Sequence, residues 1–228
     1  MSIEGLNETG HFKKKFLLSQ GRLYGILDLG YVPAEKLKAY SEQLAEGRVD
    51  ILQLRAKNLE KKKIADLARE IQSSLVEKEI LFIINDYPDI ALEIEADGVH
   101  LGQEDMPIEQ ARKYLGEEFL IGKSTHTLSQ ALTASQEPVD YIAFGPIFKT
   151  PTKPDYLPVG IESIAAVKER IKKPVFFIGG INKENISLVL SAGADRIVMV
   201  SALLGAKDIP EFCRQMRNLL SLKGLLAN

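Results

Sequence analysis

Short apolar runs alternate with longer amphipathic segments along the chain from residue 22 onward. Runs such as 80–86 (ILFIIND) and 194–201 (ADRIVMVS) are nearly continuous in apolar residues, which is typical of strands covered on both faces of a parallel sheet. The segments between the runs carry apolar residues at helical spacing, and 33–47 opens on proline and ends at glycine, as helices often do. The pattern therefore predicts eight successive strand–helix units.

The predicted units fill the chain evenly. The strands are expected at 22–28, 49–56, 80–86, 96–101, 119–124, 139–145, 174–180 and 194–201. The helices are expected at 33–47, 59–78, 88–95, 107–115, 127–136, 160–171 and 182–193, with more helical sequence toward the C-terminus. We therefore predict an α/β fold, a single (β/α)8 TIM barrel over residues 22–228, with residues 1–21 as an N-terminal extension. A doubly wound open sheet is the alternative, although no glycine fingerprint of a dinucleotide fold follows the first strand.

Composition narrows the class of protein. The 228 residues are 45% hydrophobic and 26% charged, with a net charge of −2, so no basic field points to nucleic acid. Cys213 is the only cysteine, which excludes an intrachain disulfide and argues against a thiolate metal site. No apolar run approaches the ~18 residues of a membrane span, and the N-terminus lacks the apolar core of a signal peptide. We expect a cytoplasmic protein with no membrane or nucleic-acid partner.

The segment 145–160 (GPIFKTPTKPDYLPVG) holds four of the ten prolines. A connection of this length is usually a lid or binding loop when it is not disordered. In a barrel, such loops surround the carboxyl ends of the strands, where active sites are built. Candidate chemistry is therefore sought at the strand ends.

Three polar side chains share one face of the second strand, because side chains alternate along a strand: Gln53, Arg55 and Lys57. An amide, a guanidinium and an ammonium inside a barrel are costly unless each is paired. We favour an anionic ligand as their partner. Ion pairs with acidic residues of neighbouring strands are the alternative.

Two carboxylates, Asp86 and Asp105, follow the third and fourth strands. Mg²⁺ is typically held by one or two carboxylates together with substrate phosphates. Beside an Arg–Lys pair, the two aspartates therefore predict a Mg²⁺–diphosphate site. The alternative for Asp86 is an N-cap of the following helix.

Side chains near the fourth and fifth strands have less decisive patterns. Ser124 could donate to a phosphate oxygen or cap the next helix, and His126 is a candidate acid–base group. His100 is expected to be a packed, hydrogen-bonded histidine. After the last two strands, Gly179 and Gly180, together with 200–201, predict a second anion site, the phosphate cradle common in barrel enzymes.

Taken together, these segments resemble thiamin phosphate synthases from about residue 22 to 205. The motifs that occur in the family's order and near its spacing are QLRAK, NDYPDIALEIEADGVHLGQED, GKSTH, GPIFKTPTKPDYLPVG, IGGI and VSALL. That family joins 4-amino-5-hydroxymethyl-2-methylpyrimidine diphosphate to thiazole phosphate, giving thiamin phosphate and pyrophosphate. The resemblance implies a Mg²⁺-dependent transferase of thiamin biosynthesis that acts on these small molecules. A homo-oligomer is compatible with it.

The resemblance also implies roles for individual residues. The implied substrate-binding set is Gln53, Leu54, Arg55, Ala56, Lys57, Asn85, Ser124, Thr150, Pro151, Thr152, Lys153, Gly180, Val200 and Ser201. The implied catalytic groups are Arg55, Lys57, Ser124 and Lys153, and the implied Mg²⁺ ligands are Asp86 and Asp105. The proline-rich loop would be a lid over both substrates. The sequence departs from the family at Leu27, where threonine is usual, and at Ala56, where glutamate is frequent.

The implied reaction is a dissociative substitution in which the aminopyrimidine supports a cationic methylene that the thiazole nitrogen captures. Such a reaction needs positioning and electrostatic stabilisation more than a general base. A thiazole tautomerase-like isomerase of the same fold is one alternative, although that relative lacks the paired aspartates, the Gln-x-Arg-x-Lys set and the Thr-Pro-Thr-Lys loop. A non-catalytic precursor-binding protein is the other.

Overall fold

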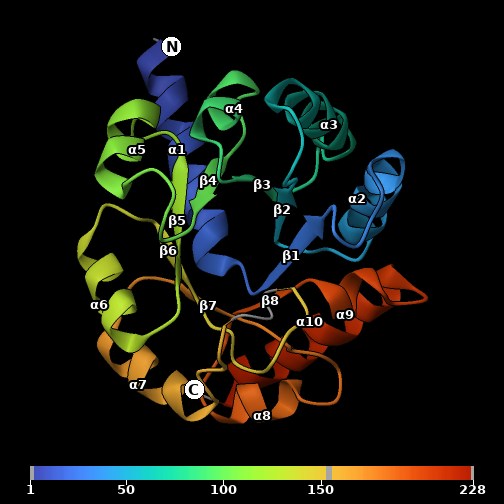
Figure 1. Ribbon diagram of the computed structural model, residues 1–228, viewed down its shortest axis with the longest axis vertical. Helices are drawn as coiled ribbons and strands as arrows, with labels where there is room; N and C mark the ends of the chain where they lie inside the picture. Colours follow the sequence, from blue (N-terminus) through green and yellow to red (C-terminus); the bar gives the residue numbers. More distant parts are fainter. Residues whose placement is uncertain (1–2, 153–155, 227–228) are drawn as a thin grey trace.

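A computed structural model of the chain, which describes residues 3–152 and 156–226, shows a closed barrel of parallel strands in sequential order (Figure 1). The strands are β1 (Leu23–Asp28), β2 (Ile51–Arg55), β3 (Leu81–Asn85), β4 (Gly98–Leu101), β5 (Leu120–Thr125), β6 (Tyr141–Phe144), β7 (Val175–Ile178) and β8 (Ile197–Met199). Pairing of β8 with β1 closes the ring. The (β/α)8 barrel predicted from the sequence is confirmed, and the open-sheet alternative is wrong.

Helices surround the strands on the outside of the barrel (Figure 1). They are α1 (Ile3–Gln20), η1 (Ala34–Lys36), α2 (Leu37–Glu46), α3 (Lys61–Ser74), α4 (Pro88–Glu93), α5 (Ile108–Leu115), α6 (Leu128–Gln136), α7 (Glu162–Arg170), α8 (Ile186–Ser191), α9 (Ser201–Leu204) and α10 (Ile209–Leu226). Each predicted strand and helix is present, with ends that differ from the prediction by a few residues. Helix α1 was not predicted. Within the described ranges, no helix has the length and apolar character that crossing a membrane requires.

Alternation along the strands separates two apolar layers. On β1, Leu23 and Leu27 belong to the large core between strands and helices, whereas Tyr24 and Ile26 point into the barrel. The interior layer is built from Leu18, Tyr24, Ile26, Ile51, Leu81, Ile83, Leu120, Tyr141, Phe176 and Val198. Side chains therefore fill the barrel up to its carboxyl end, as is usual for this fold.

Four aspartates stand just before the even-numbered strands: Asp50, Asp97, Asp140 and Asp195. The first three accept hydrogen bonds, at 2.8–2.9 Å, from backbone N–H groups at the start of the preceding odd-numbered strand. Each of the four also forms an ion pair with a lysine or arginine. This aspartate rim ties neighbouring strands together at the amino-terminal end of the barrel.

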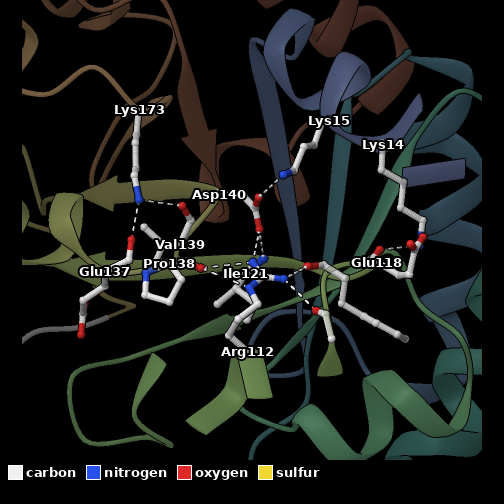
Figure 2. A network of polar contacts seen from close by, with 12 residues as sticks. Lys14, Lys15, Arg112, Glu118, Ile121, Glu137, Pro138, Val139, Asp140 and Lys173 are labelled. Atoms are coloured by element: carbon white, nitrogen blue, oxygen red, sulfur yellow. Dashed lines mark hydrogen bonds and ion pairs between the residues drawn. The ribbon is translucent and has the colours of Figure 1, made fainter. Parts of the chain in front are cut away.

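Helix α1, dark blue in Figure 1, packs against the same end. Its Leu18 is 3% exposed and joins the interior layer. Lys14 Nζ lies 3.6 Å from Asp97 Oδ1. Figure 2 shows Lys14 beside Glu118, whose carbonyl oxygen accepts from Lys14 Nζ at 3.4 Å, and Lys15 reaching Asp140, with its Nζ 3.9 Å from Asp140 Oδ1. Arg112 holds the other oxygen of Asp140 at 2.6 Å. Because α1 covers the amino-terminal end of the barrel, the carboxyl end is the side from which ligands approach.

Candidate functional site

A cavity of about 370 Å³ lies at the carboxyl ends of the strands. Twelve residues that the sequence predicted as ligand or metal contacts line it: Gln53, Arg55, Lys57, Asn85, Asp86, Asp105, Ser124, Thr150, Thr152, Gly180, Val200 and Ser201. They come from segments more than a hundred residues apart. The barrel thus brings the predicted diphosphate site and the predicted monophosphate site into one cavity.

Three members of the predicted set lie elsewhere, and a fourth falls outside the described residues. The side chains of Leu54 and Ala56 are 1% and 3% exposed and pack in the core between strands and helices, since alternation turns them away from the cavity. Pro151 lines an adjoining cavity together with Lys149 and Lys183. Lys153 lies outside the described residues.

Arg55 has an internal partner at the mouth of the cavity. Its Nη1 donates to Asp28 Oδ2 at 2.6 Å, and the two residues stand opposite each other in the β1–β2 register. Asp28 is 2% exposed and also accepts a hydrogen bond from the backbone N–H of Gly30 at 2.9 Å. The ion-pair alternative raised from the sequence therefore describes Arg55 in the ligand-free protein. Sequence reasoning missed Asp28, although its position at a strand end was the available signal.

The two predicted metal ligands face each other. Burial and the neighbouring Asp105 carboxylate raise the pKa of Asp86, while Lys57, whose Nζ lies 3.5 Å from Asp86 Oδ2, opposes the rise. Asp105 is oriented by a hydrogen bond of 2.6 Å from the Gly102 N–H. Tyr87, not Asp86, is the N-cap of α4, so the capping alternative is wrong.

This carboxylate pair fits a divalent cation. Two like charges held close together raise the pKa of one of them unless a positive charge lies between them. Within the described residues, no group of three or more histidine, cysteine or acidic side chains could hold a metal. A hard cation that takes one or two carboxylates and completes its shell with water and phosphate oxygens, as Mg²⁺ does, suits Asp86 and Asp105.

Polar side chains also continue below the cavity into the barrel. His100 is 6% exposed; its Nδ1 lies 3.1 Å from Tyr141 Oη and its Nε2 lies 2.9 Å from Ser124 Oγ. The expectation of a packed, hydrogen-bonded histidine is confirmed. Ser124 does not cap α6, because Thr127 is the N-cap and accepts from the Gln130 N–H. Its hydroxyl remains at the cavity wall.

The described parts of the proline-rich loop contact both sides of the cavity. Tyr31 Oη, in the loop after β1, lies 2.8 Å from Thr152 Oγ1. Across the cavity, the rings of Tyr156 and His126 lie 4.1 Å apart, and His126 Nδ1 lies 2.7 Å from the Gly145 carbonyl oxygen. Thr152, Tyr156 and His126 all line the cavity. The loop is therefore part of the cavity wall.

The glycine pair after β7 serves this loop. Gly179 and Gly180 have φ angles of 103° and 65°, which side chains rarely adopt. A Cβ on Gly179 would lie 2.4 Å from Pro146 Cα, and one on Gly180 would lie 2.6 Å from the Lys149 carbonyl oxygen. The glycines are thus required for the close approach of the loop, and they also leave backbone exposed in the cavity.

Comparison with known proteins gives a consistent result. The family model described as thiamine monophosphate synthase matches residues 23–203. A thiamine-phosphate synthase of Halalkalibacterium halodurans is 41% identical over 205 residues, covering 90% of this chain and 97% of the relative. One of Chloroflexus aurantiacus is 39% identical over 202 residues, covering 88% and 93%. The solved thiamine phosphate pyrophosphorylase from Pyrococcus furiosus superposes with a TM-score of 0.82 at 33% identity, covering 91% of this chain and 98% of that one.

Proposed function

The chain belongs to the thiamine monophosphate synthase family, and we propose that it condenses the aminopyrimidine diphosphate with thiazole phosphate, giving thiamin phosphate and pyrophosphate. The observation that carries this proposal is the arrangement of two facing carboxylates beside Lys57 and Arg55 at the end of one cavity. Arg55 is paired with Asp28, so Lys57 alone faces the two carboxylates Asp86 and Asp105, and a divalent cation would balance their remaining negative charge. The enzyme is a transferase of thiamin biosynthesis.

We assign the diphosphate to the β2–β3 side of the cavity. Arg55 and Lys57 would bind its oxygens, with Asn85 and Lys153 as further partners. Asp86 and Asp105 would hold Mg²⁺, which when bound neutralises part of the charge of the departing pyrophosphate. Gln53 and Ser124, deeper in the barrel, would hold the aminopyrimidine ring.

The thiazole phosphate belongs on the β7–β8 side. Gly180, Val200 and Ser201 line this part of the cavity, and Thr150 and Thr152 of the proline-rich loop line it as well. Backbone N–H groups after β7 and β8 are the usual phosphate cradle of barrel enzymes. Pro151, on the adjoining cavity, would help to fix the conformation of this segment.

In this arrangement the protein acts by position and charge. Arg55 and Lys57 stabilise negative charge as it develops on the leaving diphosphate, and the aminopyrimidine ring supports the cationic methylene. The thiazole nitrogen is held on the other side of that carbon, within the same cavity. The loop with Thr150 and Thr152 would close over both substrates.

The test is a coupling assay with pyrimidine diphosphate and thiazole phosphate, run with Mg²⁺ and with a chelator. Thiamin phosphate formed only with Mg²⁺ is expected. Asp86→Ala should lower kcat/KM by about two orders of magnitude or more, because charge stabilisation at the leaving group is lost. Asp89→Ala, at the half-exposed ion pair with Lys61, is the matched control and should keep the wild-type rate.

Other outcomes select among the alternatives. Tight binding of both substrates without product would identify a precursor-binding protein. Isomerisation of a thiazole precursor without coupling would identify a tautomerase-like enzyme. A full rate for Asp86→Ala would contradict the metal assignment. The cytoplasmic location and the assembly state stay predictions.

A further inference from the structure

A chain of hydrogen bonds crosses the interior of the barrel beneath the cavity. It joins five side chains from five strands, in the order Gln53, Tyr24, Tyr141, His100 and Ser124. The four distances between successive polar atoms are 2.6, 2.9, 3.1 and 2.9 Å. Both end residues line the cavity, whereas Tyr24 and Tyr141 are at most 1% exposed. Two ligand-facing groups are thus connected through the protein interior.

The tyrosines are held in place and keep their protons. Phe176 packs edge-on against both rings, with centroids 5.5 Å from Tyr24 and 5.6 Å from Tyr141. Burial raises the pKa of both phenols well above the ordinary value, so each hydroxyl retains its hydrogen. Each phenol therefore has one proton to donate and must accept at its other hydrogen bond in the chain.

This restriction gives the whole chain one direction. The Gln53 amide nitrogen can only donate, so Tyr24 accepts from it and donates to Tyr141. Tyr141 then donates to His100 Nδ1, which must be unprotonated, and the imidazole proton lies on Nε2. That proton is donated to Ser124 Oγ. A doubly protonated His100 would leave a buried phenol proton without an acceptor in the chain, at a cost in free energy.

The direction fixes what each end offers to a ligand. Ser124 accepts from His100, so its own hydroxyl proton is available to the cavity. Gln53 donates inward, so its carbonyl oxygen is available as an acceptor. We propose that Tyr24, Tyr141 and His100 are positioning residues that set this donor–acceptor pattern and thereby select the ligand ring.

The selected ring must present one acceptor and one donor. On the proposed function, on which this step rests, an aminopyrimidine fits, because a ring nitrogen accepts and the amino group donates. An oxopyrimidine reverses the pattern, with a ring N–H donor and a carbonyl acceptor. It would leave buried groups of the site unpaired, which is the strongest basis for rejecting an analogue of the same shape.

The direct test is the tautomer of His100, read from the ¹⁵N shifts of its ring nitrogens in ligand-free protein. The protein has three histidines, so the variants His11→Gln and His126→Gln assign the ¹⁵N signals to individual residues. We expect the proton on Nε2 in the wild type. Gln53→Glu replaces the donor by a carboxylate that only accepts, so every bond should reverse and the proton should move to Nδ1. In the double variant Gln53→Glu/Tyr141→Phe the hydrogen-bond chain is interrupted, so the His100 tautomer should be the same as in Tyr141→Phe alone.

A proton on Nδ1 in the wild type would overturn the proposal whether or not any variant folds. So would a Gln53→Glu spectrum in which the tautomer stays unchanged throughout a pH series that ionises the new carboxyl. These readings do not use the coupling reaction. If no coupling occurs while the tautomer still reverses, the proposed function fails and the directional chain stands.

Kinetics give the functional reading. Tyr141→Phe should raise the KM for pyrimidine diphosphate roughly tenfold, equivalent to about 1.4 kcal/mol, and should leave the KM for thiazole phosphate unchanged. It should also narrow the discrimination between amino- and oxopyrimidine diphosphates. Tyr114→Phe, on a phenol that is 49% exposed on α5, is the matched control. An equal rise in both KM values would indicate a general structural effect and contradict the assigned role.

Discussion

The Asp28–Arg55 ion pair connects the stability of the barrel with the charge of its cavity, and Asp28→Asn tests that connection. The two side chains are 3% and 18% exposed, and their closest atoms are 2.6 Å apart. Hydrogen bonds to charged groups contribute about 1.5–3 kcal/mol, and breaking a buried ion pair costs roughly 3–5 kcal/mol. Because Arg55 reaches solvent and asparagine still accepts one hydrogen bond, we expect a loss of about 2 kcal/mol. For a chain of this length, this lowers Tm by about 4–8 °C.

The assay is thermal unfolding with and without Mg²⁺ and pyrophosphate. When pyrophosphate supplies a new anion for Arg55, the variant should recover much of its deficit, so the difference in Tm from the wild type should shrink. Asp66→Asn, at a surface pair with both side chains about half exposed, is the control and should change stability by at most ~0.5 kcal/mol. A deficit that pyrophosphate leaves unchanged would refute contact between Arg55 and the diphosphate. An unchanged Tm without ligand would refute the energetic role of the pair.

Two further predictions concern the amino-terminal end. Leu18→Ala should lower the free energy of unfolding, measured in urea, by about 2–5 kcal/mol, because it opens a cavity in the interior layer. Phe16→Ala, at a side chain that is 55% exposed, should have little effect. Equal losses of stability in the two variants would contradict the packing of α1. Burial would raise the pKa of Asp195, but Lys168 and Arg196 lower it below its ordinary value of 3.8. The ionised Asp195 therefore stabilises the fold above pH 3.8, and this contribution is lost as the pH falls through the lowered pKa. Unfolding free energies of wild type and Asp195→Asn should therefore differ near neutral pH and converge in acid, and a constant difference would contradict this linkage.

The strands, their order and most of the cavity lining could be predicted from the sequence, because apolar periodicity locates strands and a barrel brings strand ends together. Arg55, Asp86 and Ser124 illustrate this: each is a polar residue at or just after the end of an apolar run. Tyr24 and Tyr141 could not be identified in this way. Both lie within apolar runs, and nothing local shows that their hydroxyls meet across the barrel.

The amino-terminal features were missed for different reasons. Helix α1 lacks a strong apolar face, and its order depends on contacts with distant parts of the chain such as the Lys14–Asp97 ion pair. A run of three lysines, 13–15, is by itself typical of solvated surface, but Lys14 and Lys15 form ion pairs with the aspartate rim. The rim did leave a signal, since RVD, EAD, PVD and GAD each precede an even-numbered strand. It becomes meaningful only when strand pairing shows which N–H groups those carboxylates accept from.

The two ends of the barrel use the same residue type in opposite electrostatic states. At the amino-terminal rim, Asp195 lies 2.7 Å from both Lys168 and Arg196, and its pKa is lowered, so its charge stabilises the ligand-free fold. At the carboxyl end, Asp86 faces Asp105, its lysine partner is 3.5 Å away, and its pKa is raised. The fold therefore holds an unfavourable pair of carboxylates at the end where ligands enter. A cation and a diphosphate would relieve that repulsion, so the free energy that the ligand-free cavity forgoes is recovered on binding.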